Sequence, residues 1–331
     1  MTPALDEKEL YGPVSDYFLN QGYFVVSGCQ KDDIVGTSEF GLLIERQDLR
    51  VDIAAARWHD AYQIEAIAVE CKRLGPMGRS LGAGLWQATD YQVAFDRVFI
   101  ATEALGDAGN KRSVIESLGI GHLSVDMISK TCEVVFDSDF RNRQRFNESV
   151  WESQVAPRLV MFLSFRDALG IPVRYGETFG GSGYIAKDMG GNVQYNCWFN
   201  RASGKTYFGI NVEHINSFRK ILKEADWSQL RCQLKVLKTH MLTLTKDPVP
   251  GWRSPLDVKL LGPAPCREVA IASLRKAIEE VIDEHPRQWR PHLKISASLW
   301  TYHKGLSRDT CISRVKEAKD ELSGVMKILM V

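Results

Sequence analysis

The chain has 331 residues, of which 44% are hydrophobic and 25% are charged, an ordinary composition for a globular protein long enough to form two domains. It contains no run near the ~20 apolar residues of a membrane span, and its acidic N-terminus lacks a signal-peptide core. The 7 cysteines form no C-x-x-C pair, which argues against a zinc site or a disulfide framework. We therefore expect a cytoplasmic protein with no membrane partner.

The net charge of +1 hides an asymmetry between the two halves of the chain. Residues 1–150 contain 15 Lys and Arg against 23 Asp and Glu, whereas residues 151–331 contain 27 against 18. An acidic half is suited to holding a metal ion, and a basic half to holding phosphates. The alternative, that charge simply varies between two domains, stays open.

The first predicted element is an amphipathic helix over residues 5–21, because apolar residues recur at helical spacing from Leu10 to Phe18. Asp6 is suited to cap its N-terminus. Pro13 conflicts with a long straight helix unless it lies in the first turn or at a kink.

Short apolar runs after this helix predict strands. Residues 23–27 predict the first strand, and residues 30–44 contain apolar runs that would extend the same sheet. Asp33 precedes one apolar pair, so it is a candidate site acid; a turn residue is the alternative.

Residues 49–73, reading LRVDIAAARWHDAYQIEAIAVECKR, predict a β-hairpin with a polar turn. If the hairpin is centred on Ala61, Asp52 lies opposite Glu70, because each is nine positions from the centre. Glu70 and Lys72 are two positions apart and share one face. Two carboxylates and one ammonium thus converge on an apolar sheet, where a divalent cation would relieve the repulsion between the acids. Asp52 ranks above Asp33 because of this register.

The pattern D-x17-E-x-K, with the acids at strand ends, resembles the PD-(D/E)xK or restriction-endonuclease-like nuclease superfamily. The resemblance implies that Asp52 and Glu70 bind Mg²⁺ (or Mn²⁺), helped by the carbonyl of Cys71. It also implies that Lys72 orients or activates the attacking water. The family's leading proline is absent, and Val51 takes its place.

The resemblance extends to two helices. The family often has a glutamate on its first helix that reaches the metal; we assign this role to Glu9, with Glu7 next and a capping glutamate as the alternative. A helix predicted over residues 85–95 carries Gln87 and Tyr91 on one face. This pair resembles the Q-x-x-x-Y element of RecB-like branches, which supports the lysine and the DNA. A surface glutamine and a buried tyrosine form the alternative.

The remaining elements of the first half complete an α/β fold. Residues 97–102 predict a strand, so the order of elements matches the superfamily's αβββαβ core with a mixed central sheet. Residues 110–118 predict a helix, and residues 122–125 and 132–136 predict added edge strands. We expect the first domain to span residues 1–140, before a polar linker.

Residues 148–331 predict a basic α+β domain that binds or recognises nucleic acid. Residues 249–265 are rich in proline and predict mostly loop. Helices predicted at 214–225 and 227–240 each carry basic residues suited to phosphate contact, although a solvated face is the alternative. The six basic residues are Arg219, Lys220, Lys223, Arg231, Lys235 and Lys238.

The expected function is that of a Mg²⁺-dependent DNA endonuclease acting in restriction, phage defence or repair. Cutting both strands of a duplex would be compatible with a homodimer. The alternatives are a catalytically silent nuclease-fold scaffold that binds nucleic acid or a protein partner, and an RNA-directed nuclease.

Overall fold

The computed structural model describes residues 6–27, 51–73, 79–103, 109–140, 148–170, 174–178, 182–248, 258–283 and 289–331. Its contacts divide the chain into two units, Met1–Leu163 and Ser164–Val331. Among the helices it describes, none has the length and apolar character needed to cross a membrane.

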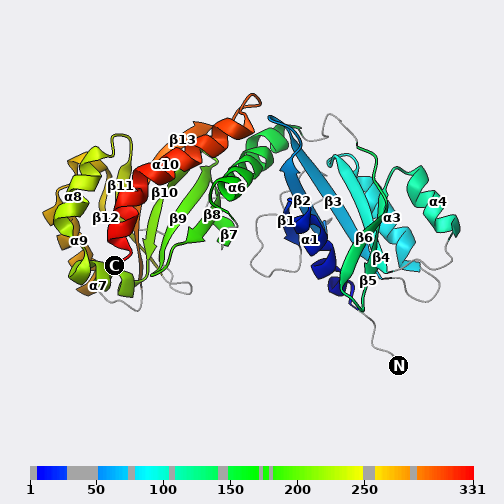
Figure 1. Cartoon of the computed structure of the whole chain (residues 1–331), viewed down its shortest axis with the longest axis horizontal. Coiled ribbons are helices and arrows are strands. Elements are labelled where there is room, and N and C mark those ends of the chain that lie inside the picture. Colours follow the sequence, from blue (N-terminus) through cyan, green and yellow to red (C-terminus); the bar gives the residue numbers. More distant parts are fainter. Residues whose placement is uncertain are drawn as a thin grey trace. The chain divides into compact units, whose positions relative to one another are not determined.

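The first unit is a mixed α/β structure built on a curled six-stranded sheet of order β1-β2-β3-β4-β5-β6 (Figure 1). Neighbouring strands run antiparallel except for β3/β4 and β4/β5, which are parallel and are joined by α3 and α4 respectively. The described elements are η1 (Glu7–Leu10), α1 (Tyr11–Asn20), β1 (Phe24–Ser27), β2 (Ile53–Trp58), β3 (Ile64–Lys72), α3 (Arg79–Tyr91), β4 (Arg97–Glu103), α4 (Gly109–Ser117), β5 (Gly121–Asp126) and β6 (Thr131–Phe136).

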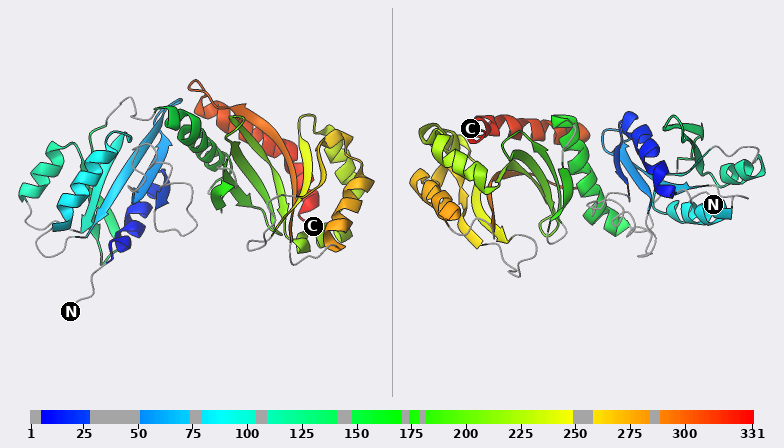
Figure 2. Two further views of the ribbon diagram at one scale, coloured as in Figure 1. Left: turned by 180° about the vertical axis from the view of Figure 1, so that it is seen from behind. Right: turned by 90° about the horizontal axis from the view of Figure 1, so that it is seen from below.

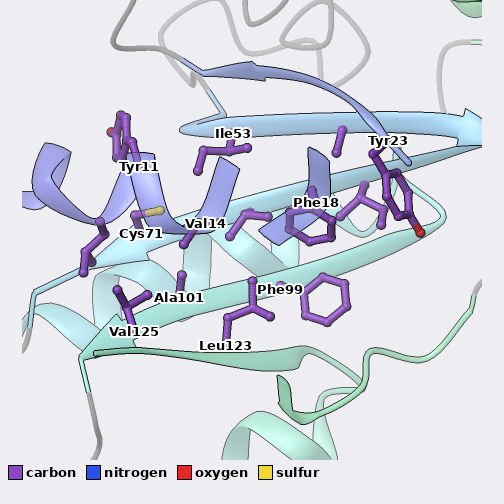
Figure 3. Close-up of a cluster of buried hydrophobic side chains, with 14 residues drawn as sticks. Tyr11, Val14, Phe18, Tyr23, Ile53, Cys71, Phe99, Ala101, Leu123 and Val125 are labelled. Carbon is purple, nitrogen blue, oxygen red and sulfur yellow. The ribbon is translucent and has the colours of Figure 1, made fainter. Parts of the chain in front are cut away.

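The N-terminal helix begins as the sequence predicts. The Asp6 side chain accepts a hydrogen bond from the backbone N–H of Lys8 at 3.1 Å. A 3-10 turn follows, and α1 starts at Tyr11, so Pro13 falls in its first turn, where it removes no needed donor. The apolar side of α1 covers one face of the sheet, where Phe18 packs edge-on against Phe99 (Figure 3).

Helix α3 begins at Arg79 and not at Leu85, where the sequence predicts its start, so Gly82 and Gly84 lie inside it. A glycine inside a helix costs about 1 kcal/mol relative to alanine, which is why the sequence predicts a helix only after these glycines. Gly84 has a packing role that offsets this cost: a Cβ at this position would lie 2.6 Å from Cγ of Lys72. Asp33 and the strand expected within 30–44 lie outside the described residues.

The second unit is built on a seven-stranded antiparallel sheet of order β12-β11-β13-β10-β9-β8-β7 (Figure 1). The elements after the first unit's sheet are α5 (Glu148–Val150), the π-helical η2 (Trp151–Val155), α6 (Ala156–Leu169), β7 (Arg174–Thr178), β8 (Ser182–Asp188), β9 (Val193–Asn200), β10 (Lys205–Glu213), α7 (Ile215–Glu224), α8 (Trp227–Val236), β11 (Met241–Pro248), β12 (Val258–Pro265), η3 (Cys266–Glu268), α9 (Ile271–Asp283), β13 (Trp289–Thr301) and α10 (Arg308–Leu329). The change of unit falls inside α6, after the polar segment 137–147 in which the sequence places the linker.

Two expectations for the second unit are contradicted within the described residues. Residues 258–265 form a strand and not a loop; β12 lies at the edge of the sheet, where the missing N–H groups of Pro263 and Pro265 are tolerated. The helix expected to continue to residue 240 ends at Val236, so Lys238 lies beyond α8.

The apolar face of the second sheet packs against helices. Phe208 on β10 stacks on Tyr195 of β9 and also contacts Phe165 of α6. Helix α10 contacts β9, β10 and β13, and it runs along the outer side of the curved sheet in Figure 2 (right). The residues that alternate with this buried set therefore lie on the other face of the sheet.

Candidate functional site

The hairpin formed by β2 and β3 has the register that the sequence predicts. Ile53 pairs with Val69, and Trp58 pairs with Ile64. Continuing this register by one residue places Asp52 opposite Glu70. Asp52 comes directly before β2, and Glu70 lies near the end of β3, so both acids sit at strand ends.

Asp52 is held by donors from two other segments. The hydroxyl of Tyr11 donates to Oδ1 at 2.5 Å, and the backbone N–H of Cys71 donates to Oδ2 at 2.8 Å. The second bond continues the β2/β3 ladder past the start of β2, with a side-chain oxygen in place of a backbone carbonyl. The position of the carboxylate is therefore fixed by the hairpin and by the start of α1.

Glu70 is 1% exposed and accepts hydrogen bonds on both oxygens. Nζ of Lys72 lies 2.7 Å from Oε1, and the hydroxyl of Tyr91 donates to Oε2 at 2.7 Å. Tyr91 comes from the last turn of α3, and Gly84 of the same helix packs on the stem of Lys72. Helix α3 thus positions both the acid and the lysine.

The two carboxylates resist being ionised together. Burial, followed by repulsion from Asp52, raises the pKa of Glu70 from 4.5 to about 7, although Lys72 and Tyr91 favour its charged form. Burial also raises the pKa of Asp52, against the hydrogen bonds from Tyr11 and Cys71. Nearby positive charge would lower both pKa values, so the pair is suited to a bound cation.

Lys72 stays positively charged in this setting. Burial by itself would lower the pKa of the ammonium group, but the hydrogen bond to Glu70 and the nearby acidic groups raise it overall. A buried ammonium that remains charged at neutral pH can stabilise negative charge on a bound group.

The first-helix glutamate that approaches this site is Glu7. Its Oε2 lies 3.3 Å from Nζ of Lys72, whereas Oε2 of Glu9 lies 2.7 Å from Arg73, which also pairs with Glu103. The 3-10 turn at the start of the helix places Glu7 on the side of the site. The structure therefore brings our second choice, Glu7, to Lys72 and holds Glu9 at Arg73.

Of the predicted pair Gln87 and Tyr91, Tyr91 contacts a site acid. Tyr91 is buried and bonded to Glu70, so it supports the acid directly, and the lysine through that acid. Gln87 lies one turn earlier on α3 and is half-buried. Sequence reasoning missed Tyr11 and Gly84, although Tyr11 follows Glu7 at the i, i+4 spacing of one helical face.

A second buried acid lies at the other end of β3. Glu65 is 1% exposed, and its oxygens bond to Arg57 at 2.8 Å, Arg97 at 2.9 Å and the Tyr23 hydroxyl at 2.9 Å. Two guanidinium groups neutralise this carboxylate, which therefore has a structural role. The two buried carboxylates of β3 therefore differ in their charge balance: Glu65 has two cationic partners, whereas Glu70 and Asp52 share the single ammonium of Lys72.

A metal ion at Asp52 and Glu70 would need further oxygen ligands. Among the described residues there is no group of three or more His, Cys, Asp or Glu that could hold a metal ion. Mg²⁺ is usually bound by only one or two carboxylates together with waters and substrate phosphates. In a strand the N–H and C=O of one residue point to the same side, so the Cys71 carbonyl faces the Asp52 side as well. The two raised carboxyl pKa values and this donor set fit Mg²⁺.

The six basic residues expected to contact nucleic acid are all exposed. Three lie on α7 and two on α8, whereas the sixth follows α8. They are Arg219, Lys220 and Lys223; Arg231 and Lys235; and Lys238.

Comparisons of the chain with protein-family models, curated proteins and solved structures gave no match.

Proposed function

We propose that this chain is a metal-dependent DNA endonuclease that hydrolyses phosphodiester bonds. The observation that carries the proposal is the meeting of Asp52, Glu70 and Lys72 at adjacent strand ends, with both carboxyl pKa values raised. A purely structural site gains nothing from two mutually repelling acids, of which Glu70 is buried and Asp52 half-buried.

Each residue of the site has a part in the proposed reaction. Asp52 and Glu70 would hold Mg²⁺, which would supply positive charge beside the scissile phosphate. Lys72 has three N–H donors, of which Glu7 and Glu70 take two among the described residues, so one remains for a phosphate oxygen or the attacking water. Tyr11 and Tyr91 keep the carboxylates in place and exclude water from their far sides.

The order of elements supports the same proposal. Helix α1, strands β1 to β3, helix α3 and strand β4 follow one another as in the αβββαβ core of PD-(D/E)xK nucleases. The site acids lie at the ends of the second and third of these strands, as in that family. We propose that the first unit has this core and that the basic second unit binds the DNA.

The test is cleavage of supercoiled plasmid by the full chain with Mg²⁺ or Mn²⁺, and with EDTA. We expect metal-dependent nicking or cutting that Asp52→Asn and Lys72→Met each reduce by at least ~100-fold, a loss typical of a removed group that stabilises transition-state charge. Glu133→Gln, at an exposed acid of β6, is the matched control and should cleave like the wild type. Circular dichroism should show that all three variants are folded.

Three outcomes would reject the proposal. Cleavage that survives both site substitutions would place the chemistry elsewhere or in a contaminant. Binding of DNA without cleavage in either metal would favour the silent scaffold, and cleavage of RNA alone would favour the RNA-directed enzyme. A role in restriction or phage defence is our proposed setting, tested by phage plating on cells that express the wild type or Asp52→Asn.

A further inference from the structure

The face of the second unit's sheet that lies opposite the buried set carries ordered rows of aromatic and polar side chains. Residues paired across strands share a face, so the register of β8, β9, β10 and β13 defines these rows. From one end of the face to the other, the rows are Tyr184, Trp198, Tyr207 and Ser298; Ala186, Asn196, Gly209 and Ser296; and Asp188, Gln194, Asn211 and Lys294.

The aromatic row is partly exposed although it lies on a sheet with a well-packed opposite face. Tyr184, Trp198 and Tyr207 are each half-buried, whereas Phe208, the next residue on β10, is fully buried on the helix side. The rings of Trp198 and Tyr207 are parallel within 11°, with centroids 5.5 Å apart. Aligned, accessible rings of this kind are suited to stacking on flat groups.

The polar rows present hydrogen-bond acceptors beside these rings. Asn211 is 2% exposed, and its Nδ2 donates to Oε1 of Glu213 at 2.5 Å; the same oxygen accepts from Gln194 at 2.8 Å. This bond fixes the nitrogen end of the Asn211 amide. Oδ1 of Asn211 and Oδ1 of Asn196 are buried and have no hydrogen-bond partner in the described part of the chain. Buried acceptors are normally satisfied by protein, water or ligand, so each of these oxygens has room for one more donor.

Charged side chains lie close to the unpaired oxygens of Asn196 and Asn211. Lys294 pairs directly with Asn211 across β10 and β13. The Glu213 carboxylate, which accepts from Asn211 and Gln194, lies on the same side, so this end of the face carries both signs of charge. Lys294 can pair with a phosphate of the ligand, and the unpaired Asn oxygens can accept from its N–H groups. The excess of basic residues in 151–331, 27 against 18, has the same sign as Lys294.

We infer that this face binds single-stranded DNA, with bases stacked on the Tyr184–Trp198–Tyr207 row and base amino groups bonded to Asn196 and Asn211. A single strand is required because the base faces and Watson–Crick edges are covered in a duplex. The inference rests on the proposed function for its ligand, since an endonuclease that opens or grips one strand needs such a surface. Gly209 lies at the centre of the face and contributes no side chain that would stand between the rings and the asparagines.

The test measures binding of short fluorescent homopolymers to the full chain carrying Asp52→Asn, in EDTA, by anisotropy. We expect dA and dC strands, whose bases carry amino groups, to bind more tightly than dT. Trp198→Ala should weaken binding of all three about 10-fold, the scale of one lost stacking contact. Asn211→Leu should weaken dA and dC about 10-fold and leave dT almost unchanged.

Matched variants separate recognition from folding. Trp86→Ala removes a tryptophan that is 76% exposed on α3 of the first unit, and it should bind like the parent. Trp198→Phe should retain most of the affinity that Trp198→Ala loses, and thermal unfolding should show that each variant is folded.

The inference is overturned if Trp198→Ala and Asn211→Leu bind like the parent, if dT binds as well as dA and dC, or if duplex DNA, RNA or a protein proves to be the preferred ligand. The proposed catalysis can fail separately, because all of these measurements use a cleavage-deficient protein without metal. Binding without any wild-type cleavage would keep this surface and reject the nuclease.

Discussion

The raised pKa of Glu70 makes a quantitative prediction about stability in the absence of metal. The folded carboxyl titrates at about 7 against an ordinary value of 4.5. Between these pH values the folded state holds a proton that the unfolded state has released, so the free energy of unfolding falls as pH rises. A shift of this size corresponds to about 3 kcal/mol lost between pH 4.5 and 7, at 1.36 kcal/mol for each unit.

The perturbation that isolates this effect is Glu70→Gln. A glutamine can still accept from Lys72 and can donate to the hydroxyl oxygen of Tyr91, so the contacts are largely kept while the titration is removed. Other groups also titrate in this range: burial lowers the pKa of His122 to about 4, which has the opposite effect on the slope. The difference between wild type and variant cancels such common contributions.

The assay is urea unfolding in EDTA at a series of pH values from about 4.5 to 8. We expect the wild type to lose about 3 kcal/mol relative to Glu70→Gln over this range, with most of the loss between pH 4.5 and 7. Adding Mg²⁺ should restore stability to the wild type at pH 8 and have little effect on the variant. Parallel pH profiles for the two proteins would show that Glu70 is ionised throughout, and the cation-site reasoning would lose its electrostatic basis.

Two further predictions concern packing around β3. Gly84→Ala should displace Lys72, because the added Cβ would lie 2.6 Å from Cγ of Lys72, and plasmid cleavage should fall at least ~10-fold. The control is Gly82→Ala, whose added Cβ meets nothing within 4 Å. This control should keep its activity, and its free energy of unfolding in urea should rise by up to about 1 kcal/mol. Equal activity of the two variants would remove the role given to Gly84. Glu65→Gln should lower the free energy of unfolding by about 3 kcal/mol with or without Mg²⁺, because two guanidinium groups lose a buried counter-ion. If the same unfolding measurement showed a loss that depends on Mg²⁺, the structural role given to Glu65 would be wrong.

The hairpin register could be predicted from the sequence because it depends on local information. A polar turn between two apolar runs places its centre, and counting outward from Ala61 puts Asp52 opposite Glu70. The helical stripe from Leu10 to Phe18 is equally local, and Leu10, Val14 and Phe18 lie in the buried core of the first unit.

The features that the sequence did not indicate depend on contacts between distant segments. Tyr11 is an ordinary helical residue until α1 brings its hydroxyl to Asp52, which is 41 positions away. Gly84 lowers helix propensity, and only its contact with Lys72 explains a helix there. The strand β12 contains prolines, which local rules assign to a loop, and its edge position in the sheet removes the objection.

The bond from Cys71 N–H to Asp52 joins the chemistry of the site to the integrity of the sheet. Because Asp52 also accepts this bond, replacing it with a residue that lacks the acceptor would open the end of the hairpin. Such a substitution at position 52 would therefore harm both the site and the sheet. If the proposed cleavage were lost and the fold kept, asparagine is the residue expected here, since its side chain retains the acceptor while giving up the charge.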